Sequence, residues 1–166
     1  MRKTRVTEGK SAEKQVAEFM AKYDPAIAKL ARAALVRLRE RLPGAVELVY
    51  DNYNALVIGF SPTERASDAI ISLALYPRWV NLFFLEGAYL SDPHKLLKGD
   101  GKLVRSVKLG DAATVDKPEI AALIAQAVAF CDQEFAAQAP RRLIIKSISA
   151  KQRPRRPSGE AAHRVR

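Results

Sequence analysis

Two glycines and a lysine stand together in Gly99-Asp100-Gly101-Lys102, as they do in loops that hold a phosphate. A Walker-type loop needs its glycines five positions apart, a Ser or Thr after the lysine, and a helix that begins there. Here the glycines are two apart, Leu103 follows the lysine, and the next residues alternate as in a strand. Asp-Gly before a strand is a strong signal of a tight turn. The sequence therefore predicts a turn at this point.

Arg105 lies in the expected strand after this turn, and it shares a face with three apolar residues, Leu103, Val107 and Leu109. A cation on an apolar face needs a partner, because an unpaired buried charge is very costly. Glu47 or Glu86 is a suitable partner, and Arg105 is then structural. The alternative is that Arg105 faces a pocket and holds an anionic group through a bidentate contact.

Tyr50, Asp51 and Tyr53 lie near the junction of two expected strands. Aromatic rings beside an acidic group are able to line a small-ligand site, although tyrosines at the end of a sheet more often pack with a wet hydroxyl. Tyr50 and Tyr53, with Lys102 and Arg105, are therefore the candidate residues of a small-ligand pocket.

Metal and catalytic chemistry has less support in the sequence. Asp92 and Asp100 flank His94, which is in principle a ligand set for iron or manganese. The alternative is an exposed Asp-Pro turn with a solvated histidine. Cys131 has no histidine near it in sequence to act as a base, and no serine triad or pair of acid–base carboxylates is visible. We expect a binding protein rather than an enzyme.

The formal net charge of +10 is concentrated at the two ends of the 166 residues. Residues 1–10 and 141–166 carry net charges of +3 and +8, and residues 11–140 carry −1. The segment 150–166 lacks an apolar pattern, which predicts a disordered basic tail. Cations in such a tail bind nucleic acid through counterion release; the candidates are Lys151, Arg153, Arg155 and Arg156. A merely solubilising tail is the alternative.

The periodicity of the apolar residues predicts the helices and strands that position these residues. An amphipathic helix is expected over 11–23, and a second over 26–42 with Asp24 as its cap and Pro25 in its first turn. A third follows Asp116 and Glu119, which have the spacing of a capping box, and its stripe runs through Cys131 to Phe135.

Strands are expected between the second and third helices and after the third, over 46–52, 53–60, 69–76, 79–87, 102–109 and 141–149. This order predicts one α+β domain over 11–149, in which an antiparallel sheet of about five or six strands packs against two N-terminal helices and one C-terminal helix. A basic extension (1–10) and the tail (150–166) flank it. No apolar run approaches the roughly 18 residues of a membrane span, the N-terminus does not resemble a signal peptide, and one cysteine excludes an internal disulfide. A cytoplasmic location is expected.

The stretch FLEGAYLSDPHKLLKGDGKLVRSVKL (84–109) resembles the signature of the YdhG-like family, a bacterial domain of unknown function: Asp-Pro, Leu-Leu, Gly-x-Gly-Lys and then an arginine. AVELVYDNYNALVIGF (45–60) is similar to the family's opening hairpin. The resemblance covers roughly residues 15–135 and implies an antiparallel sheet with helices at both ends. It also implies a frataxin-like iron-chaperone role, for which the acidic residues are Glu47, Asp51, Glu86 and Asp92.

Two functions therefore remain open. The first is a non-catalytic module that binds iron or a small ligand. The second is a protein associated with nucleic acid or the ribosome through its basic ends.

Overall fold

Two helices open the fold. The structure is a computed structural model that describes residues 5–6 and 9–157, with side chains from residue 11 on. Helix α1 (Gly9–Ala21) presents buried apolar residues at helical spacing, and Tyr23 follows it as a buried residue. Helix α2 (Pro25–Arg41) begins after Asp24, as predicted, but the Asp24 side chain makes no capping hydrogen bond. Its buried positions are those of one helical face, Ala28, Ala31, Ala34, Leu35 and Leu38.

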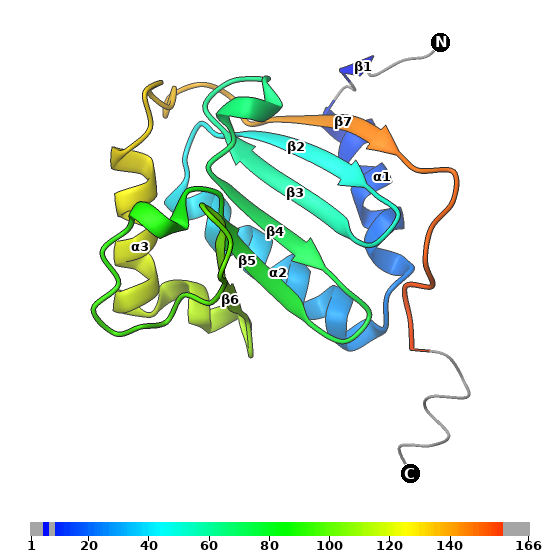
Figure 1. Cartoon of the computed structure of the whole chain (residues 1–166). Helices are drawn as coiled ribbons and strands as arrows, with labels where there is room; N and C mark the ends of the chain where they lie inside the picture. Colours follow the sequence, from blue (N-terminus) through cyan, green and yellow to red (C-terminus); the bar gives the residue numbers. More distant parts are fainter. Residues whose placement is uncertain (1–4, 7–8, 158–166) are drawn as a thin grey trace.

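The sheet has the strand order β1-β7-β2-β3-β4-β5-β6 (Figure 1). Its strands are β1 (Arg5–Val6), β2 (Val46–Asp51), β3 (Leu56–Ser61), β4 (Ile71–Leu75), β5 (Val80–Phe84), β6 (Arg105–Lys108) and β7 (Arg142–Ile148). Neighbouring strands are antiparallel except β2 and β7, which run parallel. The α+β fold is thus confirmed, with one parallel pair in a mostly antiparallel sheet.

Helix α3 (Pro118–Ala129) differs from its prediction at both ends. Asp116 ends a short 3-10 helix, η3 (Ala112–Asp116), and Lys117 occupies the N-cap position of α3 without a side-chain hydrogen bond. The expected capping box is wrong because the Asp116 carboxylate is bound instead by Arg37 and Arg41 of α2. Cys131 lies beyond the end of the helix.

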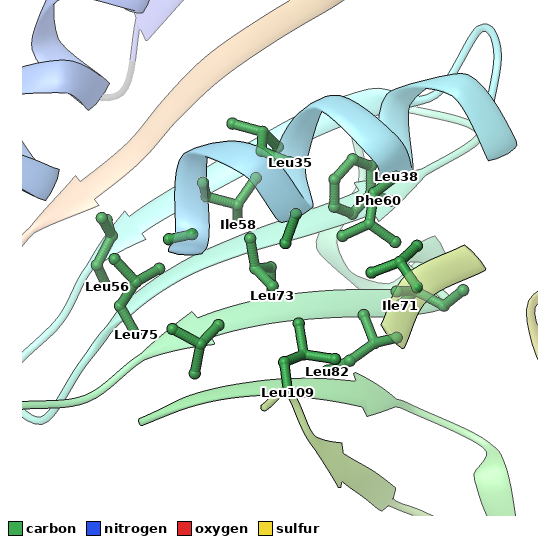
Figure 2. Close-up of a cluster of buried hydrophobic side chains, with 14 of the residues drawn as sticks. Leu35, Leu38, Leu56, Ile58, Phe60, Ile71, Leu73, Leu75, Leu82 and Leu109 are labelled. Atoms are coloured by element: carbon green, nitrogen blue, oxygen red, sulfur yellow. The ribbon is translucent and has the colours of Figure 1, made fainter. Parts of the chain in front are cut away.

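The core lies between the helices and one face of the sheet. Figure 2 shows Leu35 and Leu38 of α2 over alternate residues of β3 and β4. This alternation follows from strand geometry, in which successive side chains point to opposite faces. A second, smaller cluster on the opposite face consists of strand residues alone: Val46, Leu48 and Ile144 with Tyr50 packed against them. We call this opposite side the open face of the sheet. No helix in the described ranges is long and apolar enough to cross a membrane.

Candidate functional site

Two tight turns project at one end of the sheet. The β2–β3 turn is closed by the Asn52 amide, which donates to the Ala55 carbonyl at 2.9 Å. The β4–β5 turn is closed in the same way by Tyr76 and the carbonyl of Trp79, also at 2.9 Å. Large aromatic side chains are exposed here, with Tyr53 at 45% and Trp79 at 40% of their full accessible area. Single exposed apolar side chains are common on protein surfaces, but here two turns bring two exposed aromatic rings to the same end of the sheet.

Residues 149–157, which we call the C-terminal segment, return along this end of the sheet (Figure 1). The Ser149 amide donates to the Asp51 carbonyl, and the Arg153 amide donates to the Tyr53 carbonyl, each at 2.9 Å. This differs from the expected disordered tail, because backbone and guanidinium hydrogen bonds hold a segment that has no apolar pattern. The remainder of the predicted tail, 158–166, lies outside the described residues.

Arg155 anchors the C-terminal segment in the body of the protein. It is only 5% exposed, and its Nη2 lies 2.9 Å from Oδ1 of Asp51, which is fully buried. The same guanidinium donates to the carbonyls of Asn52 and Tyr53 and lies 5.6 Å from the centre of the Tyr23 ring. A buried charge is tolerable only with such a set of partners, so these contacts fix the position of the whole segment.

The surroundings of Arg155 are themselves rigidly held. The second oxygen of Asp51 accepts from Lys22 Nζ at 2.6 Å, and Lys22 also donates to Gln152 at 2.9 Å. The Tyr23 hydroxyl donates to the Leu75 carbonyl and accepts from the Leu56 amide, both at 3.0 Å. Burial raises the pKa of the Tyr23 phenol, with the charge of Arg155 acting in the opposite direction. The Tyr23 ring is therefore neutral and fixed in position beside the Arg155 guanidinium.

A groove of about 630 Å³ lies between the C-terminal segment and the two turns. It is lined by Asn54, Tyr76, Pro77, Trp79, Arg153, Pro154 and Arg156, and we call it the aromatic groove. The rings of Tyr76 and Trp79 are 5.9 Å apart at a tilt of 38°. Cations accompany the rings: Lys108 Nζ lies 5.4 Å from the Trp79 ring, and the Arg153 guanidinium lies 5.7 Å from the Tyr53 ring. Burial raises the pKa of Tyr76, which keeps its hydroxyl neutral.

Trp79, which lines the aromatic groove, adjoins the open face of the sheet. Val80 is fully buried on the helix side, so strand alternation places its neighbour Asn81 on the open face. Trp79 lies in the turn just before β5, and Lys108 lies over its ring. Asn81 pairs with Lys108 across β5 and β6. Its side-chain Oδ1 is buried and has no hydrogen-bond partner among the described residues. Such orphaned acceptors are rare in folded proteins and call for an explanation.

The four candidate residues of the small-ligand pocket do not line one site. Tyr50 and Tyr53 belong to β2 and its turn, whereas Lys102 and Arg105 lie at the β6 edge, with β3, β4 and β5 in between. Tyr50 packs on the open face, and burial raises the pKa of its hydroxyl. Of the four, only Tyr53 is near the aromatic groove.

Arg105 stabilises its own loop. Its Nη1 donates to the carbonyls of Gly101 and Val104 at 2.7 and 2.9 Å, rather than to Glu47 or Glu86. Lys98 bridges to Ser106 across this loop, and Gly99 has a φ of 132°. The glycine-rich stretch therefore belongs to a loop between Lys98 and Ser106 with no helix after it, but it is more open than the predicted tight turn. The strand after it begins at Arg105 and not at Lys102.

The acidic candidates from the family resemblance lie in separate environments. Glu47 is bound by two nitrogens of Arg39, both at 2.8 Å. Burial by itself lowers the pKa of Arg39, but the hydrogen bond and charge of Glu47 raise it overall. Asp51 is paired with Arg155 and Lys22, Glu86 is exposed, and Asp92 accepts from the amides of Leu96 and Leu97. Across residues 11–157, no three His, Cys, Asp or Glu side chains gather as a metal site would require.

Trp79, Tyr76 and Asn81 were not among the predicted site residues. In the sequence, Pro77-Arg78 only separates the two strands expected over 69–76 and 79–87. The available signal was the turn itself: an aromatic residue on each side of Pro-Arg, next to a strand whose outward positions include a polar Asn81. Lys151, Arg153, Arg155 and Arg156 were predicted as one group, but the structure separates them. Lys151 and Arg153 are exposed, Arg156 is half-exposed, and Arg155 is buried.

Comparison with protein-family models, with curated proteins and with solved structures gave no match. The YdhG-like resemblance and the iron role that it implies therefore remain predictions.

Proposed function

We propose that this protein binds single-stranded nucleic acid in the aromatic groove and on the adjoining open face of the sheet. The observation that carries this proposal is the exposure of Tyr53 and Trp79 at one end of the sheet, each with a cationic side chain over its ring. Proteins that hold single strands combine a basic track for the backbone with aromatic rings for the bases.

The rings supply the stacking part of this combination. Each aromatic side chain that stacks on a base contributes about 1–3 kcal/mol, and stacking requires a base that is free of its own helix. Tyr76 and Trp79 lie on opposite sides of a two-residue turn, which holds their rings at a fixed separation. A pair of rings held in this way favours an unpaired strand over a duplex.

The cations supply the electrostatic part. Arg153 and Arg156 line the groove, and Lys108 lies over Trp79. Arg78 is exposed in the turn between the two aromatic residues. Two acidic side chains that contact the C-terminal segment are already paired, since Asp51 is buried against Arg155 and Asp24 lies 3.8 Å from Arg156. The groove is thus suited to a polyanion.

The experiment is a titration of a short fluorescein-labelled oligonucleotide by anisotropy, with the same sequence as a single strand and as a duplex. We expect micromolar binding of the single strand, weaker binding of the duplex, and a negative dependence on salt with a slope of about −0.7 for each phosphate contact. Trp79→Ala should weaken binding by roughly 1–3 kcal/mol. Arg153→Ala/Arg156→Ala should weaken it and reduce the salt slope by about 1.4.

The matched control is Lys14→Ala/Lys117→Ala, which removes the same charge from exposed positions on α1 and before α3. It should leave the affinity within about twofold of the unmodified protein, since these residues are remote from the groove. Equal losses in the control and the groove variant would show that only net charge matters. Tighter binding of the duplex than of the single strand would exclude the stacking mechanism.

A further inference from the structure

The surroundings of Arg155 have the composition of a recognition site for a guanidinium group. They combine the Asp51 carboxylate, the carbonyls of Asn52 and Tyr53, and the face of the Tyr23 ring. A planar guanidinium donates in a fixed fork and stacks on aromatic faces, and an ammonium cannot reproduce this pattern. All four groups belong to the body of the protein, so the site is independent of the chain segment that fills it.

The occupant does not use the site completely. Arg155 is only 5% exposed, and its Nε is buried without a hydrogen-bond partner among the described residues. An unsatisfied buried donor opposes docking. Arg155 also belongs to a segment that contributes no large apolar side chain. Backbone hydrogen bonds of Ser149 and Arg153 and the polar side chains of Gln152 and Arg156 also hold the segment. Arg155 is the buried side chain among these contacts.

Docking of Arg155 also decides the shape of the aromatic groove. Three of the residues that line it, Arg153, Pro154 and Arg156, belong to the C-terminal segment and lie within two positions of Arg155. If Arg155 leaves its site, one wall of the groove and two of its cations leave with it.

We propose that Tyr23, Asp51, Asn52 and Tyr53 form a guanidinium-binding site. We further propose that Arg155 in this site acts as a latch, meaning that its binding holds the C-terminal segment in place and so completes the aromatic groove. The first half of the proposal is independent of the function proposed above. The second half rests on that function, because it concerns access of the nucleic acid to the groove.

The first experiment is a chemical rescue of the full-length Arg155→Ala variant, followed by thermal unfolding without nucleic acid. Loss of a buried pair should lower the melting temperature by about 5–10 °C. Millimolar methylguanidinium should restore part of this loss saturably, because it enters the vacated site, whereas methylammonium at equal ionic strength should not. The unmodified protein, whose site is filled, and Arg156→Ala, which loses an exposed side chain, are the controls. If methylguanidinium does not raise the melting temperature of Arg155→Ala, or raises it equally in all three proteins, the guanidinium site is overturned.

A second variant serves if Arg155→Ala does not fold. Arg155→Lys keeps the charge but lacks the planar fork, so we expect the C-terminal segment to undock more often. Trypsin should then cleave after Lys151 faster than in the unmodified protein. The fluorescence of Trp79, the only tryptophan of the chain, should also change, because Trp79 faces this segment across the groove. Unchanged cleavage and fluorescence overturn the latch.

The oligonucleotide titration separates the two halves of the proposal. Arg155→Ala should bind the single strand about tenfold more weakly, and methylguanidinium should not restore this affinity, because the free cation fills the site without tethering the segment. Unweakened binding by Arg155→Ala overturns the latch. If no protein binds the oligonucleotide but the rescue succeeds, the proposed function fails and the guanidinium site stands.

Discussion

Tyr23 connects three parts of the fold through one side chain. Its hydroxyl bonds to β3 at Leu56 and to β4 at Leu75, and its ring faces Arg155. Tyr23→Phe keeps the ring and leaves two buried backbone groups without partners. We expect a loss of about 2–4 kcal/mol in the free energy of unfolding, measured by urea denaturation. A loss below about 0.5 kcal/mol would show that water replaces the hydroxyl.

The same residue gives a dependence on pH with a defined sign. Burial raises the pKa of the Tyr23 phenol above its ordinary value of 10.0. The unfolded chain releases this proton near pH 10, while the folded chain still holds it, so the stability due to Tyr23 is present below pH 10 and is lost as the pH rises above it. The difference in stability between the unmodified protein and Tyr23→Phe should therefore shrink in alkaline solution. A constant difference from about pH 8 to 11 would contradict this assignment.

Asn81 provides a residue-scale test of base recognition. Its Oδ1 lacks a hydrogen-bond partner among the described residues, and Asn81 lies on the open face, two positions after Trp79. Among side chains, asparagine pairs well with adenine, because its amide oxygen and nitrogen bond the base together. Asn81→Ala should fold at least as stably as the unmodified protein, because the orphaned acceptor is removed. It should also lose about 1–3 kcal/mol of preference between oligo(A) and oligo(U). An unchanged preference would assign Asn81 no part in recognition.

At the scale of elements, Asp116 joins α2 to the start of α3. Arg37 and Arg41, one turn apart on α2, both bind its carboxylate. The hydrogen bond from Arg37 lowers the pKa of Asp116, with Arg41 acting in the same direction and burial opposing it. Such a carboxylate stabilises the fold above its ordinary pKa of 3.8 and loses this effect as the pH falls below that value.

Asp116→Asn should consequently lower the melting temperature at pH 7 and have a much smaller effect at about pH 2.5. The measurement is circular dichroism during heating at both values of pH. Asp111→Asn is a matched control, since Asp111 caps η3 and bonds Thr114 but forms no ion pair with α2. Equal effects of Asp116→Asn at the two values of pH would assign the effect to geometry instead of charge.

The elements themselves followed from local sequence pattern, while most of the site did not. The strand expected over 53–60 was found as β3, because the alternation that marks it is contained within that one strand. Its buried face carries Leu56, Ile58 and Phe60. The capping role of Asp116 and the disorder of residue 155 were inferred from neighbours in sequence. The actual partners are 79 and 104 positions away in the chain. A pairing of this kind depends on tertiary placement, which no local window contains.

At the scale of the whole molecule, the acidic residues bear on the predicted iron role. A hard metal ion needs several oxygen ligands at one point. Glu47 and Asp51 face the helix side of β2 and are each held by an arginine, while Asp92 is engaged in its own loop. Iron bound at Glu47 or Asp51 would have to displace a guanidinium and leave it buried and unpaired, at a cost of several kcal/mol.

We therefore expect an anaerobic calorimetric titration of the full chain with iron(II) to give no saturable heat in the micromolar range. Asp51→Asn and Glu86→Gln are the informative variants, because Asp51 is buried in ion pairs whereas Glu86 is exposed. Saturable binding that Asp51→Asn abolishes would mean that the ion pair with Arg155 opens to admit the metal. The latch that assembles the aromatic groove would then respond to iron, and the two functions predicted from sequence would share one switch. Binding abolished only by Glu86→Gln would place iron at the opposite end of the sheet and leave the groove untouched.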